Sequence, residues 1–362
     1  MKKVGVGILG CGGISKTYIT NINEKFNDTL QIVACADLNE EATNAAVAKC
    51  QGAHASSYKD MLENDAVEIV LNLTNSWAHF ETSLQALEAG KHVYSEKTLT
   101  LGRAQANTLV ALAQQKNLLL GCAPDTFMGA GMQTVRALID RGDCGKIYYA
   151  YAFIGMNANH PNYATKRHGG MLFDMGPYYV ASLVNLFGPV ARVSGISKKL
   201  YDKRVYGDQE YELEIPSTST AVLEFESGVL AHFTTCSDTI HYTPKFEVYG
   251  TKGNLVANDP NHFSGDLTVQ YAGKEVETLS MTHQYADNCR GIGLVDMARV
   301  LRGSGVLCGS GVFRANGEFA RHLVDVLQSI WESSEKGKTI EITYPCAQPA
   351  PVAKNGDLGC SK

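Results

Sequence analysis

The sequence predicts an α/β protein with an N-terminal parallel sheet and a C-terminal α+β domain built on a large, mostly antiparallel, open sheet. Two observations support this prediction. Over residues 1–123, short apolar segments alternate with helical segments, which is the pattern of βαβ units and a parallel sheet. After Pro124 the pattern changes to a series of β segments with few helices, which is typical of a sheet packed on one face.

In the N-terminal part, strands and helices are expected in strict alternation. The expected strands are Val4–Leu9, Leu30–Ala36, Glu68–Leu73, His92–Ser95 and Leu118–Cys122. The expected helices are Ile14–Asn23, Glu40–Cys50, Ser57–Asn64, Trp77–Ala89 and Ala104–Lys116. Asn39 is the expected N-cap of the second helix, and Gly90 should end the fourth. Because ligands bind at the carboxyl ends of parallel strands, the residues that follow each strand should form the site.

The C-terminal part is expected to begin with a helix, Met128–Arg141, and a strand, Ile147–Ile154. An irregular loop, 155–168, then leads to a helix from Gly176 to Phe187. The β segments that follow are Ala191–Lys199, Ser219–Glu226, Val229–Cys236, Lys245–Val256, Leu267–Tyr271 and Glu275–Leu279. Two helices, Asp287–Leu301 and Asn316–Lys336, and a strand, Thr339–Ile342, come last. We therefore expect domains at 1–123 and 124–345 and a loose tail at 346–362.

A glycine-rich turn from Gly10 to Ser15 joins the first strand to the first helix. Gly10 permits a sharp turn, and the missing side chain at Gly12 lets a pyrophosphate approach the backbone. The helix that follows, with Gly13 and Ile14 at its start, points its unpaired N–H groups and its positive dipole end at the phosphates. The second strand ends at Asp37, which can accept hydrogen bonds from the adenosine ribose. The turn alone is weak evidence, but with Asp37 it predicts a Rossmann-type dinucleotide site.

Composition and charge exclude several classes of function. The 362 residues are 44% hydrophobic and 19% charged, which is typical of a globular protein with a real core. A net charge of −5 without any basic tract argues against nucleic acid or anionic membranes as partners. The N-terminal apolar stretch is too short for a signal peptide or a membrane span, which predicts a cytoplasmic protein. The ten cysteines lack C-x-x-C or zinc-site spacing, so we expect reduced thiols and no metal.

Two polar clusters lie where chemistry is expected. Glu96-Lys97-Thr98 ends the fourth strand, where a lysine would be near the nicotinamide end of a dinucleotide laid across the sheet. A surface lysine at a strand end is the alternative. The second cluster contains Asp174 and Tyr178, which share a helix face if a helix begins near Asp174. Taken alone, helix capping and core packing are the better interpretation of this second cluster.

Together these segments resemble the glucose–fructose oxidoreductase/inositol dehydrogenase/rhizopine catabolism (Gfo/Idh/MocA) family. The resemblance covers nearly the whole chain, through Val4–Ile14, Ala89–Lys97, Gly170–Tyr178 and Arg290–Ala298. It implies a nicotinamide-binding Rossmann domain, a C-terminal domain with a large open sheet, and hydride transfer on sugars, polyols or related compounds. It also implies that Lys97 and Tyr178 form the acid/base pair, with Asp174 orienting the substrate or the lysine.

The chain departs from the family pattern at several places. Thr98 stands where the family has a cis proline, and a non-proline cis bond costs about 2.5–4 kcal/mol, so the sequence leaves open whether the Lys97–Thr98 peptide is cis or trans. Thr74-Asn75 replaces the usual Thr-Pro pair after the third strand. Tyr178 stands in the place of the inositol dehydrogenase histidine, which is similar to the glucose–fructose oxidoreductase and dimeric dihydrodiol dehydrogenase branch. The aspartate of that branch three residues later is Ala181 here.

Further polar candidates complete the predicted site. His79 follows Thr74 at the family's spacing and is expected near the nicotinamide, with helix capping or packing as the alternative. The expected cofactor contacts are completed by His79 together with Thr74, Asn75, Glu96 and Lys97. A sugar-like substrate needs several hydrogen-bond partners in its pocket. The candidates for this role are Asp125, Thr126, Phe127, His160, Asn162 and His168.

The sequence therefore predicts an NAD(H)-dependent oxidoreductase of a sugar or sugar-like alcohol, with NADP less favoured. Two alternatives stay open. One is a redox-neutral enzyme that oxidises a sugar transiently, eliminates a leaving group and re-reduces the product. The other is a non-catalytic sensor of a dinucleotide or sugar, against which Lys97 and Tyr178 argue. The wide C-terminal sheet with few covering helices predicts a homodimer or homotetramer that pairs through this sheet.

Overall fold

A computed structural model describes residues 2–158, 160–303 and 313–358. The residues group into two compact units. The first contains Met1–Asp125, Cys289–Arg321 and Leu358–Lys362, and the second contains Thr126–Asn288 and His322–Asp357. The first unit is thus discontinuous in sequence, because the segment Cys289–Arg321 returns to it, and sequence interpretation had assigned that segment to the second domain.

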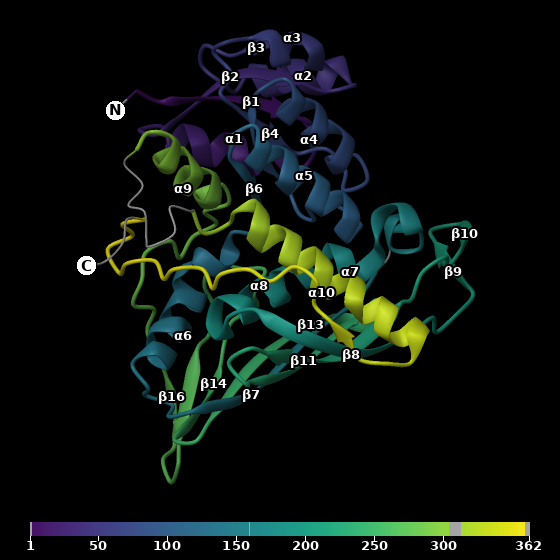
Figure 1. The fold of residues 1–362 in the computed structure, drawn as a ribbon, viewed down its shortest axis with the longest axis vertical. Helices are drawn as coiled ribbons and strands as arrows, with labels where there is room; N and C mark the ends of the chain where they lie inside the picture. The colour runs from purple at the N-terminus through teal and green to yellow at the C-terminus, as the bar shows by residue number, and fades with distance from the viewer. Residues whose placement is uncertain (1, 159, 304–312, 359–362) are drawn as a thin grey trace. The chain divides into compact units, whose positions relative to one another are not determined.

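The first unit is built on a parallel sheet with the strand order β3-β2-β1-β4-β5-β6 (Figure 1). The strands are β1 Val4–Leu9, β2 Leu30–Ala36, β3 His54–Ala55, β4 Ile69–Asn72, β5 His92–Ser95 and β6 Leu120–Cys122. The connecting helices are α1 Ser15–Glu24, α2 Glu40–Val47, α3 Tyr58–Glu63, α4 His79–Glu88 and α5 Arg103–Gln115. This is the doubly wound order, and its direction reverses between β1 and β4, where such sheets bind their ligands.

The sequence explains most of these elements. Every residue of β1 and β4 is buried, as expected for strands of a parallel sheet covered on both faces. The Asn39 side chain accepts hydrogen bonds from two N–H groups in the first turn of α2, which confirms the predicted N-cap. Gly90 lies just beyond α4 with a φ of +80°, as a residue that ends a helix should. The short strand β3 was not predicted, because two residues carry no measurable period.

The second unit is built on a nine-stranded sheet with the order β16-β15-β14-β13-β7-β12-β11-β8-β17. β7 and β12 pair in parallel, and the other neighbours pair antiparallel, which confirms a mostly antiparallel sheet. The strands are β7 Ile147–Asn157, β8 Val190–Lys198, β11 Thr218–Phe225, β12 Leu230–Cys236, β13 Asp238–Gly250, β14 Gly253–Val256, β15 Thr268–Tyr271, β16 Val276–Thr278 and β17 Ile340–Glu341.

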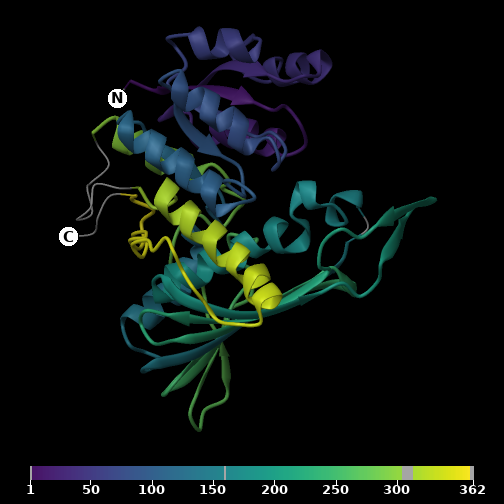
Figure 2. The same ribbon diagram turned by 45° about the vertical axis from the view of Figure 1, so that its right-hand side comes forward.

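Helices cover one face of this sheet and leave the other face open (Figures 1 and 2). They include α6 Ala130–Asp140, α7 Gly170–Asp174 and α8 Gly176–Phe187, and every residue of α8 is buried. Along β7, Ala150, Ala152 and Ile154 are buried toward the helices, whereas the alternate residues are only half-buried. The 3₁₀ turns Thr126–Met128, Pro161–Tyr163 and Lys166–His168 complete this part of the unit.

Several predicted boundaries were wrong for identifiable reasons. The expected strand Lys245–Val256 is two strands, because the chain reverses at Thr251-Lys252 between β13 and β14. The expected helix Asp287–Leu301 begins only at Ile292, as α9 Ile292–Leu301, because Gly291 has a φ of +104°. The hairpin of β9 Lys203–Tyr206 and β10 Gln209–Glu212 was not predicted, and it extends away from the sheet (Figure 2). The final helix, α10 Gly317–Lys336, matches its prediction within one residue.

The C-terminal segment is not the loose tail expected from its composition, at least as far as residue 358. The Gln133 side chain accepts a hydrogen bond from the Val352 N–H at 2.8 Å, and the Gln348 side chain donates to the Asn185 carbonyl at 2.9 Å. Val352 and Leu358 are both buried. In the described ranges, none of the helices combines the length and the apolar character that a membrane span requires.

Candidate functional site

The glycine-rich turn at the end of β1 leaves its backbone open. At Gly10, where φ is +95°, a Cβ atom would come within 2.6 Å of the Leu73 backbone, so only glycine fits. At Gly12 and Gly13 a Cβ atom would meet nothing within 4 Å. The hydroxyl of Ser15, the first residue of α1, donates to the Gly12 carbonyl at 2.7 Å and fixes the turn against the helix. The turn therefore fits a pyrophosphate approaching the backbone and the N-terminus of α1.

The carboxylate of Asp37 is hydrogen-bonded to this turn. Its Oδ2 atom accepts a hydrogen bond from the Cys11 N–H at 2.6 Å, and its Oδ1 atom accepts one from the Asn39 N–H at 2.8 Å. Each carboxylate oxygen keeps a second lone pair, so Asp37 can still accept from ribose hydroxyls. The next residue, Leu38, is fully exposed. Sequence reasoning found the acidic residue but not its contact with the turn.

The loops after β4 and β5 are joined by His79. Its Nδ1 atom lies 2.7 Å from the Thr98 carbonyl oxygen, and its Nε2 atom lies 3.0 Å from the Thr74 carbonyl oxygen. Burial lowers the pKa of this histidine, which favours a neutral ring. Asn72 accepts a 2.7 Å hydrogen bond from the Thr74 hydroxyl, whereas Asn75 is exposed. His79 thus positions two loops at the carboxyl edge of the sheet, and its ring nitrogens face backbone.

Just after β5, the side chain of Glu96 is buried. Glu96 is 8% exposed, and its Oε1 atom accepts a 2.9 Å hydrogen bond from the Tyr18 hydroxyl. Its Oε2 atom accepts a hydrogen bond from the Lys97 N–H at 3.0 Å. The Lys97–Thr98 peptide, whose state the sequence left open, is cis. Lys97 itself is half-buried.

In the second unit, the Asp174–Tyr178 segment is not one helix. Asp174 is the last residue of α7, Met175 interrupts the helix, and α8 begins at Gly176 with Pro177 in its first turn. The expected common helix face of Asp174 and Tyr178 was therefore wrong. Asp174 Oδ2 accepts a 2.5 Å hydrogen bond from the Tyr163 hydroxyl, which fixes its orientation. Tyr178 is 7% exposed.

The predicted substrate residues fall into two groups. Asp125, Thr126 and Phe127 are buried. Asp125 Oδ2 accepts the N–H groups of Gly291 and Gly293 at 2.9 and 3.0 Å, and burial raises the pKa of this carboxyl to about 6. The structure thus shows Asp125 as the acceptor at the start of α9, rather than as a side chain presented to a ligand.

The loop residues are more accessible. His160 is exposed, and its Nδ1 atom accepts a hydrogen bond from the Asn162 N–H at 3.2 Å. His168 Nδ1 lies 2.9 Å from the Thr165 hydroxyl, and burial lowers the pKa of this ring. These contacts are local to the loop, and all three side chains remain candidates for binding hydroxyl groups.

Sequence reasoning missed a polar network around Asp259. Its carboxylate accepts hydrogen bonds from the hydroxyls of Tyr179, at 2.9 Å, and of Tyr242, and it lies 3.1 Å from His262 Nδ1. Burial and this carboxylate raise the pKa of both phenols. Tyr242 lies on β13, Asp259 and His262 follow β14, and Tyr179 is next to the predicted acid/base residue Tyr178 in α8. No local motif could have identified the network, because its members are distant in sequence.

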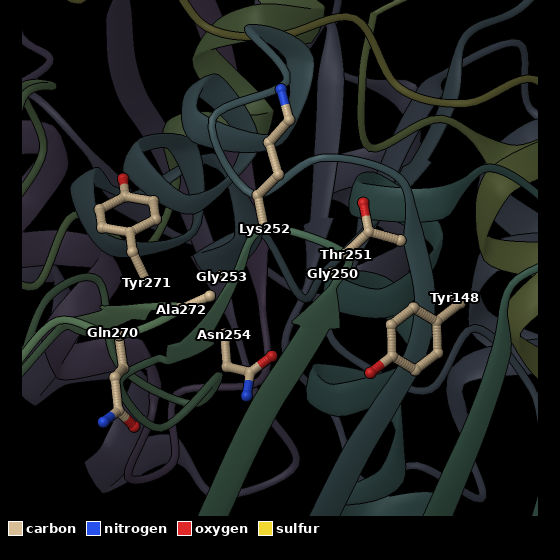
Figure 3. Close-up of a pocket in the computed structure, with 10 residues that line it drawn as sticks. Tyr148, Gly250, Thr251, Lys252, Gly253, Asn254, Gln270, Tyr271 and Ala272 are labelled. Atoms are coloured by element: carbon tan, nitrogen blue, oxygen red, sulfur yellow. The ribbon is translucent and has the colours of Figure 1, made fainter.

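The second unit also carries a surface pocket of about 310 Å³ at the outer ends of β7, β13, β14 and β15. Figure 3 shows Tyr148 and Tyr271 on opposite sides of it, with Lys252 and Asn254 between them. None of the predicted site residues lines this pocket. Within the described ranges there is no group of three or more His, Cys, Asp or Glu side chains placed to hold a metal ion.

Comparison with known proteins gives matches over both units. A family model described as an oxidoreductase family with an NAD-binding Rossmann fold matches residues 4–123, and a model of the GFO/IDH/MocA C-terminal domain matches residues 132–256. A trans-1,2-dihydrobenzene-1,2-diol dehydrogenase from Bos taurus is 27% identical over 278 residues, which are 74% of this chain and 78% of that protein.

Two further similarities concern proteins whose names include a sugar. A dTDP-3,4-didehydro-2,6-dideoxy-alpha-D-glucose 3-reductase from Saccharopolyspora spinosa is 28% identical over 262 residues, which are 71% of this chain and 75% of that protein. The solved structure of a levoglucosan dehydrogenase in complex with NADH has the same fold. It superposes with a TM-score of 0.82 at 16% identity over 94% of this chain and 99% of that chain.

Proposed function

The chain belongs to the Gfo/Idh/MocA oxidoreductase family, and we propose that it is an NAD(H)-dependent dehydrogenase that acts on a sugar, polyol or related alcohol. The observation that carries this proposal is the open backbone at Gly12 and Gly13 next to the Asp37 carboxylate, which is bonded to the turn through Cys11. By their names, one relative acts on a cyclic diol and another reduces position 3 of a didehydro-deoxysugar, so both act at a ring carbon that carries a hydroxyl or a carbonyl oxygen.

The residues at the carboxyl edge of the parallel sheet fit a dinucleotide. The backbone of Gly10, Gly12, Gly13 and Ile14 would hold the pyrophosphate, and Asp37 would hold the adenosine ribose. When bound, the nicotinamide accepts or returns a hydride at the substrate carbon. We propose NAD rather than NADP because the carboxylate of Asp37 would repel a 2′-phosphate. Neither Leu38 nor Asn39 supplies a cation to neutralise it.

We propose that Tyr178 exchanges the proton of the substrate hydroxyl. A free phenol has a pKa near 10, which is too high for an efficient base at neutral pH. A lysine cation that acts on the same oxygen would stabilise the phenolate, and the family resemblance assigns this role to Lys97. Asp174, oriented by the Tyr163 hydroxyl, would hold a substrate hydroxyl or the lysine. His160, Asn162 and His168 are the proposed partners of further hydroxyls.

We also propose that the protein is a homodimer or homotetramer that pairs through the open face of the nine-stranded sheet. On this face Tyr149, Tyr151 and Phe153 are only half-buried. On β8 and β11 of the same sheet, Ile196 is 60% exposed and Val222 is 44% exposed. Exposed apolar side chains on a sheet face that no helix covers often mark an interface between subunits.

The function is tested by incubating the protein with NAD and a panel of sugars, polyols and cyclic diols while the nicotinamide absorbance is followed. Net formation of NADH with one of them supports the proposal. Release of a leaving group without net NADH would identify the redox-neutral alternative instead. Binding of NAD or sugar without any turnover on the panel would support a sensor and reject the dehydrogenase.

A further inference from the structure

Three cysteine thiols come together beneath the glycine-rich turn. Cys11 lies in the turn itself, Cys35 lies on β2, and Cys50 follows α2. The thiol of Cys35 lies next to the thiols of both Cys11 and Cys50. The Cys11 thiol donates to the Ala36 carbonyl at 3.7 Å, and the Cys50 thiol donates to the Ala46 carbonyl at 3.2 Å. All three are free thiols, and all are buried, at 8%, 0% and 5% exposure. The sequence shows no hint of this cluster, because its members are not spaced as a motif.

A pocket connects this cluster to the protein surface. It has a volume of about 350 Å³ and lies between α1 and α2, and its lining includes Cys11, Gly12 and Gly13. Cys35 and Cys50 do not line it, so Cys11 is the member that a small reagent meets first. Lys16 and Lys49, both exposed, also line the pocket and make it electropositive.

The contacts among the three thiols divide them into different roles. The contact with Cys35 lowers the pKa of Cys11, although burial and the charge of Asp37 oppose this effect. The contacts with Cys11 and Cys50 raise the pKa of Cys35, and the contact with Cys35 lowers the pKa of Cys50 as well. Cys11 lines the pocket and Cys50 does not, and an accessible thiol with a lowered pKa is the type that reacts with oxidants.

We propose that Cys11 and Cys35 form an oxidation-sensitive pair in which a hydroperoxide reacts at Cys11 and Cys35 then closes a disulfide. The Cys11 sulfur attacks one peroxide oxygen and the O–O bond breaks, which leaves a sulfenic acid on Cys11 and releases water or an alcohol. The Cys35 sulfur then attacks the Cys11 sulfur, and the displaced hydroxide takes the Cys35 proton and leaves as water. Two thiols lose two electrons in total, and the hydroperoxide gains them.

The position of Cys11 couples this reaction to the turn. Its N–H group donates to Asp37, and its neighbours are Gly10 and Gly12. A disulfide has an S–S distance of about 2.05 Å, much shorter than a contact between two thiols, so Cys11 must move toward β2 when it forms. The consequence for NAD rests on the function proposed above, whereas the disulfide itself does not. Oxidation should weaken NAD binding, and reduction should restore it.

The experiment treats the full-length reduced protein with hydrogen peroxide and then measures intact mass, peptide maps and NAD affinity. We expect a loss of two hydrogens that maps to Cys11–Cys35, a dissociation constant for NAD that rises roughly tenfold or more, and recovery with dithiothreitol. Cys50→Ser should keep this response. Cys35→Ser should stop at a sulfenic acid on Cys11, which dimedone traps.

Several results would overturn the proposal. A Cys11 that stays a free thiol while other cysteines react, or a disulfide between Cys35 and Cys50, removes Cys11 from its role. A Cys11–Cys35 disulfide that leaves NAD affinity unchanged removes the coupling to the turn. If the reduced protein does not bind NAD at all, the proposed function fails, and the peptide map still decides whether the thiol pair exists.

Discussion

The hydroxyl of Tyr18 donates a 2.9 Å hydrogen bond to Glu96 Oε1, and this contact joins helix α1 to the strand end that carries Lys97. Both side chains are buried, and Glu96 also accepts the Lys97 N–H. The element that follows the glycine-rich turn and the element that positions the proposed lysine are therefore held by one carboxylate.

Tyr18→Phe should leave Glu96 without this buried donor. We expect the free energy of unfolding to fall by about 1–3 kcal/mol, together with a lower kcat, because Lys97 loses part of its support. Urea unfolding and steady-state kinetics measure the two effects. Tyr58→Phe is the matched control, since its hydroxyl donates to the Thr82 carbonyl elsewhere in the same unit. Equal kinetic effects of the two variants would show that Tyr18 has no positioning role.

Leu38→Arg should relax the preference for NAD. Leu38 is fully exposed beside Asp37, so an arginine fits without steric cost and could pair with a 2′-phosphate. The ratio of kcat/KM for NAD to kcat/KM for NADP should fall, and it should fall further when Asp37→Ser is added. Leu38→Gln, a long polar side chain without charge, should leave the ratio nearly unchanged. A wild-type protein that already uses NADP equally well would contradict the basis of this prediction.

Tyr178→Phe should keep NAD binding and lose turnover by roughly 10²–10⁴-fold, because the proposed proton acceptor is gone. Lys97→Ala should do at least as much damage. Tyr179→Phe is the control, because its hydroxyl is bonded to Asp259 and it should lose far less activity. If Tyr178→Phe works at near wild-type rate from about pH 6 to 10, Tyr178 only packs. The base must then be sought among the loop histidines, with His160 first.

Light scattering at micromolar concentration should give the mass of a dimer or tetramer. Val222→Asp combined with Ile196→Asp places two charges on the open sheet face and should dissociate the subunits. Leu200→Asp, at an exposed residue outside the strands, should leave the assembly intact. A wild-type protein of monomeric mass would reject pairing through the sheet.

Asp125 should make the stability of the protein depend on pH. Burial holds the pKa of its carboxyl at about 6 in the folded state, against roughly 3.9 in an unfolded chain. Between the two pKa values, the folded state holds a proton on Asp125 that the unfolded chain has already released. The free energy of unfolding should therefore fall as pH rises from about 4 to 6, and this effect should be complete above pH 6.

Asp125→Asn tests this directly, because the amide oxygen can still accept the N–H groups of Gly291 and Gly293 but cannot titrate. Its stability relative to wild type should rise by up to about 3 kcal/mol between about pH 4 and pH 7, as measured by urea unfolding. A difference that does not change with pH would show that the carboxyl titrates normally.

The sequence predicts best those elements whose residue pattern lies within one short segment of the chain. β1, β2 and β5 were predicted to the residue, since buried parallel strands are continuous apolar runs that end at glycine or polar residues. β13 and β14 were merged because apolar residues continue on both sides of the reversal at Thr251-Lys252. The glycine-rich turn and Asp37 were predicted because their positions are set by the strands.

The non-local parts of the candidate site could not be predicted in this way. The Asp259 network and the Cys11–Cys35–Cys50 cluster each bring together residues from separate elements. The spacing of these residues along the chain does not indicate that they are in contact. The helix from Gly176 was predicted, whereas α7 before it was not, because a five-residue helix is too short to show a helical period.

The return of the segment Cys289–Arg321 to the first unit has a consequence for how the protein is made. The last strand of the parallel sheet, β6, is bridged at Gly121 to Asn316, and the Cys122 N–H donates to the Ala315 carbonyl. During synthesis, the N-terminal half of the chain leaves the ribosome with this strand edge unpaired. The Asp125 carboxylate is also still without the N–H groups of Gly291 and Gly293. An unpaired edge is a template for pairing with other chains, so the nascent protein needs protection until almost all of it has been translated.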